Sequence, residues 1–298
     1  MKRKVIRMAD STSLISLPKN WVHLNSVNKG DELEIIDLGN KLLIKGKLSN
    51  KSTVINLNDT TDKDLIWRYI VTVYRKGNDN ITVIYNNETT LKEIQNFIAD
   101  LIGFAIVKEE KNSITIKDLI QSDNSNLDET LRKILSLLID MSNTIYTAIN
   151  KSKKDALKSI EHADYNVNRF TNLFLRIINI HGHLNHYSTN SFYKITSIIE
   201  EIGDEYRRLA FLYDGKKIGN DTLIAFNSVN KLIVDYSELL FNFSFERLKE
   251  FHEASNNAKN LLTNVKTVSI NESRVLGSLS TILHLTKSLS EESILMNL

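Results

Sequence analysis

The sequence predicts a multidomain α+β protein: a β domain at the N-terminus, a small α+β module in the middle, and a helical bundle at the C-terminus. Its 298 residues exceed what one hydrophobic core usually spans. Short apolar runs broken by turn residues fill the first segment, whereas apolar residues repeat every three and four positions in the last. We therefore expect domains at residues 1–48, 49–122 and 123–298.

Composition limits the classes of function. The chain has no cysteine, which excludes disulfides, thiolate zinc sites and cysteine nucleophiles and leaves His, Asp and Glu as metal ligands. No apolar run is long enough to span a bilayer, and polar residues follow the basic start, so we expect a cytoplasmic protein without membrane insertion. A net charge of +2 means that any nucleic-acid surface must be a local patch.

The first segment has the spacing of short strands. Gly30 within Lys29-Gly30-Asp31 predicts a turn with positive φ, and Gly39-Asn40 predicts a tight hairpin. So small a piece cannot bury enough surface alone, and we expect a second copy to complete it as a homodimer. The apolar runs lie at Val5-Ile6 and at residues 14–17, 33–36 and 42–44.

The middle segment alternates strands and helices. Its expected strands are residues 52–57, 81–85, 104–107 and 113–116, with a helix at 62–75. Thr90, with Glu93 three residues later, has the pattern of a capping box and predicts the start of a second helix, which Gly103 ends. The role of this α+β module is not visible in the sequence.

The last segment shows helical periodicity throughout. Interruptions fall near residues 151–154, 181–191, 215–221 and 268–272. The segments between them are long, which predicts an antiparallel bundle of five or six helices.

Three strings in the first segment, SLPKNW, KGDELEI and LLIK, resemble the AbrB/SpoVT/MazE class. That resemblance implies a swapped-hairpin dimer that lies on double-stranded DNA, with basic side chains meeting phosphates. Leu14 and Val22-His23 stand where the bacterial regulators carry further arginines, and the plain alternative is that the basic residues only keep the surface soluble. The implied DNA-binding residues are Lys2, Arg3, Lys4, Arg7 and Lys19.

The arrangement of all three segments resembles archaeal PhoU-like phosphate-uptake regulators. YRKGNDNITV and LIGFAIVKEEKNSITIKDLI are similar to the linker module of that family, and IIEEIGDEYRRLA resembles the PhoU signature Glu-x-x-x-Asp, carried here by Glu200 and Asp204. A four-residue step places both carboxylates on one helix face, where they could share a divalent or ferric ion. The string IEHADYNVNRFTNLFLR resembles an earlier helix of the family, with Asp164, Arg169 and Arg176 in place, although Asn166 and Asn168 stand where acids are expected.

Two simpler interpretations stay open for these residues. Glu200 and Asp204, with Glu201 and Glu205 nearby, could form an ordinary charged helix face that Arg207 and Arg208 neutralise. The string HGHLNH, with His181, His183 and His186, suggests a transition-metal site, but its place between two expected helices favours a solvated loop.

No enzyme motif is present. The sequence lacks a Gly-rich phosphate loop, a Ser-centred elbow and a kinase set, and it offers no acid and base pair in an identifiable pocket. The resemblances imply a phosphate-responsive DNA-binding regulator of phosphate uptake, with the bundle as its sensor. The alternative is a signalling adaptor that binds a phosphate transporter or sensor kinase and uses the hairpin domain only to dimerise.

Overall fold

A computed structural model describes most of the chain, which divides into two compact units at residues 1–51 and 52–298. Both strands and helices are present, which confirms the expected α+β class. The described residues are 1–9, 12–37, 39–46, 51–58, 60–120, 127–182, 186–266 and 269–298.

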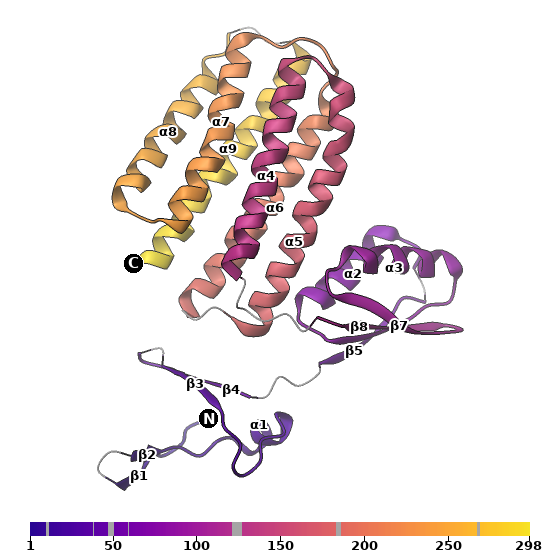
Figure 1. The fold of residues 1–298 in the computed structure, drawn as a ribbon, viewed down its shortest axis with the longest axis vertical. Coiled ribbons are helices and arrows are strands. Elements are labelled where there is room, and N and C mark those ends of the chain that lie inside the picture. Colours follow the sequence, from indigo (N-terminus) through magenta and orange to yellow (C-terminus); the bar gives the residue numbers. More distant parts are fainter. Residues whose placement is uncertain are drawn as a thin grey trace. The chain divides into compact units, whose positions relative to one another are not determined.

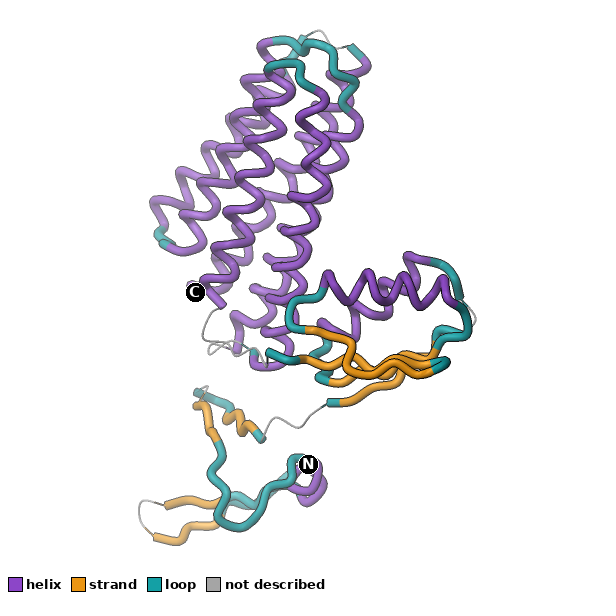
Figure 2. Tube along the Cα trace, turned by 45° about the vertical axis from the view of Figure 1, so that its right-hand side comes forward, coloured by secondary structure: helices purple, strands orange, loops and turns teal. Residues whose placement is uncertain are grey.

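The first unit contains two antiparallel hairpins and one short helix (Figures 1 and 2). Gly30 and Gly39 have φ of +93° and +76°, so both expected turns are confirmed. The Gly39 amide donates to Asp37 Oδ1 at 2.8 Å, which fixes the second hairpin. The elements are β1 (Ile6–Ala9), β2 (Thr12–Leu14), α1 (Lys19–Leu24), β3 (Glu34–Asp37) and β4 (Leu42–Lys45).

This unit has no core of its own in the part that the structure describes: none of its described residues is buried. Apolar strand residues lie open to solvent instead, including Met8 at 71%, Ile35 at 60% and Leu42 at 63% exposure. In so small a unit, exposed apolar surface of this kind is typical of interaction sites.

The second unit begins with a four-stranded sheet in the order β5-β6-β8-β7. Strands β5 and β6 are parallel, and the other two pairings are antiparallel. Helices α2 and α3 lie together on one face of the sheet (Figures 1 and 2). The elements are β5 (Ser52–Asn56), α2 (Lys63–Arg75), β6 (Asn80–Ile84), α3 (Glu88–Asp100), β7 (Phe104–Glu110) and β8 (Ser113–Asp118).

The expected capping box at Thr90 is wrong. Asn87 caps α3 instead, because its side chain accepts a hydrogen bond from the Thr90 amide at 2.8 Å. Thr90 is buried inside the first turn, and its hydroxyl donates to the carbonyl of Thr60 at 2.9 Å. The Thr90 hydroxyl, which the sequence pattern predicted to cap the helix, therefore makes a tertiary contact with Thr60 instead.

In the described part of the chain, six long helices follow, consistent with the expected five or six. Their breaks agree with all four interruptions expected from the sequence, and a further break precedes Ser244, the residue that caps α8. No helix among the described residues is long and apolar enough to cross a membrane. The helices are α4 (Leu127–Asn150), α5 (Ile160–His181), α6 (His186–Leu212), α7 (Asn220–Phe241), α8 (Phe245–Thr263) and α9 (Ile270–Asn297), with a 3-10 helix, η1 (Lys154–Ser159), before α5.

Polar contacts add to the apolar core of the bundle. The Tyr206 hydroxyl on α6 donates to Asn230 Oδ1 on α7 at 2.6 Å, and Asn230 Nδ2 donates to the carbonyl of Ser142 on α4 at 3.1 Å. All three residues are buried, so this chain of bonds fixes the register of three helices.

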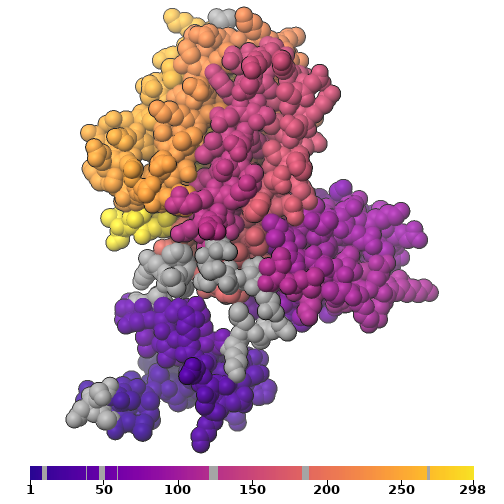
Figure 3. All heavy atoms as spheres, viewed as in Figure 1, coloured from indigo at the N-terminus to yellow at the C-terminus, as the bar shows by residue number. Residues whose placement is uncertain are grey.

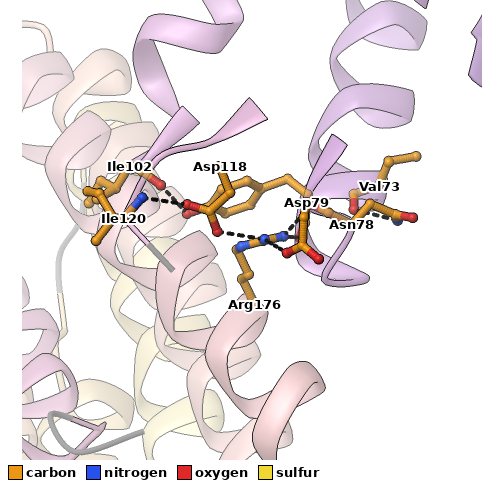
Figure 4. A network of polar contacts seen from close by, with 8 residues as sticks. Val73, Asn78, Asp79, Ile102, Asp118, Ile120 and Arg176 are labelled. Atoms are coloured by element: carbon orange, nitrogen blue, oxygen red, sulfur yellow. Dashed lines mark hydrogen bonds and ion pairs between the residues drawn. The ribbon is translucent and has the colours of Figure 1, made fainter. Parts of the chain in front are cut away.

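The α+β module packs against α5 as a lobe on the side of the bundle (Figure 3). Arg176 of α5 enters the module and is only 1% exposed. Its guanidinium donates to Asp118 at 2.8 Å and to Asp79 at 3.2 Å (Figure 4). It also donates to the carbonyls of Tyr74 and Asn78, at 2.8 and 2.9 Å.

Candidate functional site

The carboxylate of Glu200 on α6 is bound by an arginine from the α+β module. Arg75, the last residue of α2, approaches both oxygens of Glu200 at 3.0 Å with Nη2. Its Nε donates to Asn172 Oδ1 on α5 at 2.6 Å, which holds the guanidinium in place. The contact between Arg75 and Glu200 joins residues that are 125 positions apart in the sequence.

Asp164 and Asp204 share a second arginine. Arg207 Nε lies 3.1 Å from Asp164 Oδ2, and Arg207 Nη2 donates to Asp204 Oδ1 at 3.1 Å. Asn168 Nδ2 also donates to Asp164 Oδ2, at 3.3 Å. The structure thus brings Asp164 of α5 beside α6, as the sequence-based prediction required.

The other oxygen of Asp164 is buried. Asp164 is 6% exposed, and its Oδ1 has no hydrogen-bond partner among the described residues. A Cβ placed on Gly203 would stand 3.7 Å from this oxygen, and at ordinary contact distance from Val167 and Leu138. Burial raises the pKa of Asp164 to about 6; Arg207 opposes the shift, while Asp204 and Glu200 add to it.

Burial also raises the pKa of Glu200. The charge and hydrogen bonds of Arg75 oppose this shift, and the nearby Asp204 and Glu201 add to it. Asp164, Glu200 and Asp204 therefore interact electrostatically as one group, the carboxylate cluster.

This arrangement does not fit a metal ion, which needs several oxygen or nitrogen ligands free to converge on it. Arg75 occupies both oxygens of Glu200, and Arg207 occupies one oxygen each of Asp164 and Asp204. Within the described ranges, no group of three or more His, Asp or Glu side chains is placed to hold a metal. A divalent or ferric ion at this cluster stays a prediction for measurement in solution.

Neighbouring charges on α6 are paired in the way the simpler interpretation anticipated. Arg208 Nε donates to Glu205 Oε2 at 2.7 Å, and Arg207 pairs as described above. The residues of HGHLNH divide between elements: His181 is the last residue of α5, whereas His183 and the side chain of His186 lie outside the described residues.

The N-terminal basic residues predicted to bind DNA are all exposed. Lys2, Arg3 and Lys4 precede β1, Arg7 lies in β1, and Lys19 begins α1. Side chains alternate along a strand, so Arg7 lies on the opposite face from its neighbour Ile6. Among described residues, no carboxylate forms an ion pair with any of these five side chains.

Arg75, Asp100 and Tyr165 help to organise this region, and no pattern in the sequence points to them. Arg75 ends a predicted helix, and nothing local points to its partner. The Tyr165 hydroxyl donates to Asp100 Oδ1 at 2.5 Å, and Arg169 Nε donates to the Asp100 carbonyl at 3.3 Å, so α5 also holds the end of α3. Only the aromatic and basic character of α5 is visible in the sequence.

A cleft of about 590 Å³ lies where the module meets the bundle. Trp67 and Phe97 come from the module, Tyr165 and Asp164 from α5, and Arg207 from α6. Its size is within the range of small-molecule pockets, and it has both aromatic and charged walls.

Comparisons with known proteins give no assignment. No protein family matches the chain, and no curated protein or solved structure is significantly similar to it. The functions implied by the short resembling strings are therefore proposals.

Asp164 should make the stability of the protein depend on pH. Its pKa of about 6 in the folded chain exceeds the usual 3.8, so the folded state holds a proton that the unfolded state releases. The resulting stabilisation is present below the lower value and is lost as the pH rises through the higher one. Relative to Asp164→Asn, which cannot ionise, the wild-type free energy of unfolding should fall by on the order of 1 to 2 kcal/mol between about pH 4 and pH 7.

Urea unfolding of both proteins across this range measures the difference. A difference that stays constant, or that rises with pH, would contradict the account of Asp164.

Proposed function

We propose that the protein is a dimeric, DNA-binding regulator that responds to phosphate supply, with the first unit docking on duplex DNA and the bundle receiving the signal. The observation that carries the proposal is the first unit, in which exposed basic residues accompany strands whose apolar side chains have no core. The link to phosphate uptake comes from the resemblance to PhoU-like regulators.

Dimerisation follows from the exposed apolar strands. A second copy has the same strands and the same exposed apolar side chains, so pairing the two units covers both apolar surfaces at once. The strands of the second hairpin place Ile35 opposite Ile44 and Ile36 opposite Leu43, which gives a short apolar ribbon for such pairing. Other proteins are less suited, because a self-complementary surface needs no further partner.

Charge supports DNA as the ligand. Residues 1–51 contain ten Lys and Arg against five Asp and Glu, a net charge of +5, whereas the whole chain carries +2. Positive charge is thus concentrated in the small unit, and the remaining residues are net negative. A local basic patch of this kind favours the phosphate backbone of nucleic acid.

One observation favours the adaptor alternative. Phe211 near the end of α6 is 83% exposed and borders a groove that is lined by charged side chains and by apolar ones such as Leu157 and Ile160. An exposed aromatic residue in such a setting is typical of contact with another protein. A phosphate transporter subunit or a sensor kinase is the partner that the PhoU resemblance implies.

Ile35→Asp should convert the dimer into a monomer, because it would bury a charge among apolar strands. Val54→Asp is the matched control: Val54 is also an exposed strand residue, at 65%, but it belongs to the second unit. Light scattering on the full chain should show a dimer for wild type and Val54→Asp. A wild-type monomer, or a dimer that survives deletion of residues 1–51, would rule out this interface.

Binding to duplex DNA should fall steeply with salt, because lysine and arginine displace counterions from phosphates. If half or more of the ten candidate side chains in the dimer contact phosphate, affinity should drop on the order of a thousandfold between roughly 50 and 200 mM salt. Replacing Arg3, Lys4 and Arg7 together by Ala should weaken binding to every sequence and flatten the slope.

The control for the loss of three positive charges replaces Lys151, Lys153 and Lys154 by Ala; these lysines are exposed in the second unit. It should leave both affinity and slope unchanged. Identical weak binding by wild type and by the N-terminal triple variant would reject the DNA-binding function and favour the adaptor.

A further inference from the structure

We propose that Arg75 and Arg207 are the resident cations of the carboxylate cluster, so that guanidinium groups of the chain itself take the place of a metal ion, and that Arg75 also clamps the α+β module to α6. This inference concerns the second unit only and does not depend on DNA binding.

Arg75 is suited to this role by its position and its geometry. It lies at the C-terminal end of α2, where the helix dipole favours a positive charge. Its side chain and that of Glu200 are 24% and 25% exposed, so water screens their attraction only in part. The bond to Asn172 fixes the guanidinium plane, so Arg75 connects the module to two helices of the bundle.

Arg207 acts as a cation shared by two carboxylates. It contacts Asp164 through Nε and Asp204 through Nη2, so the several donors of one planar guanidinium serve two carboxylates at once. Asp164 is the buried member of the pair and Arg207 is half exposed, so the arginine reaches inward from the surface. Without it, a carboxylate with 8% side-chain exposure would lack a charged partner.

The two arginines and a divalent ion would compete for the same oxygens. A metal that took both oxygens of Glu200 would have to displace Arg75, and with it one ion pair between the module and α6. Two guanidinium groups paired with the three carboxylates offset two of their three negative charges. The folded chain therefore offers a divalent ion little electrostatic gain at this cluster.

Metal titration separates the two interpretations. Full-length wild-type protein, treated with chelator and then dialysed, is titrated with Mn²⁺, Mg²⁺, Zn²⁺ and Fe³⁺ separately, while melting temperature and bound metal are followed. Wild type should retain no stoichiometric metal, and its melting temperature should not rise with any of these ions. The double variant Arg75→Gln, Arg207→Gln should melt lower without metal and should bind Mn²⁺ about tenfold or more tightly than wild type.

Matched variants identify the cause of any increase in Mn²⁺ affinity. Arg208→Gln removes the same charge from the next residue on α6, where Arg208 pairs with Glu205, and should not respond to Mn²⁺. Adding Glu200→Gln to the double variant should abolish the increase in Mn²⁺ affinity. Should the double variant fail to fold, Arg207→Gln alone provides the comparison, since its side chain is half exposed.

One equivalent of metal in wild type that is lost in Glu200→Gln would overturn the proposal. A folded double variant, or Arg207→Gln in its place, with no greater affinity for Mn²⁺ than wild type would overturn it as well.

Discussion

The arrangement of the second unit depends on the buried guanidinium of Arg176. A charge at 1% exposure is costly unless ion pairs and hydrogen bonds replace its water, and the module supplies two carboxylates and two backbone carbonyls. It also supplies aromatic faces, with the ring centres of Tyr74 and Phe104 at 5.1 and 4.9 Å from Cζ. Because Asp118 is buried as well, the module without α5 would lose the positive charge that Arg176 places beside this carboxylate. This mutual requirement explains why module and bundle form one compact unit.

Most of the fold could be predicted because its signals are local. Helical periodicity predicted the helical segments of the bundle, although it did not separate α7 from α8, and Gly30 and Gly39 marked turns that need positive φ. The prediction at Thr90 was wrong because a threonine hydroxyl can either cap a helix or donate to a distant carbonyl. The packing of α3 places the Thr90 hydroxyl against the carbonyl of Thr60. The break before Ser244 was missed because the helical pattern continues across it.

The candidate site could be predicted only in part. The four-residue spacing and the resemblance to PhoU brought Glu200, Asp204 and Asp164 to attention, and the structure places them in one cluster. Only one of the two arginines that pair with these carboxylates could be predicted from the sequence. Arg207 lies three residues beyond Asp204, but Arg75 comes from the α+β module. Contacts between distant segments depend on tertiary packing, which short strings do not encode.

Hydrogen exchange, followed by mass spectrometry on the full chain, tests most directly whether Arg176 joins the module to the bundle. In wild type, peptides from α2 and α5 should open with the same free energy. In Arg176→Met, peptides from α2 and β8 should exchange on the order of a hundredfold faster or more, because removing one partner of a buried ion pair costs about 3 to 5 kcal/mol. Peptides from α7 and α9 should keep their protection. Unchanged exchange of α2 and β8 in Arg176→Met would contradict the account.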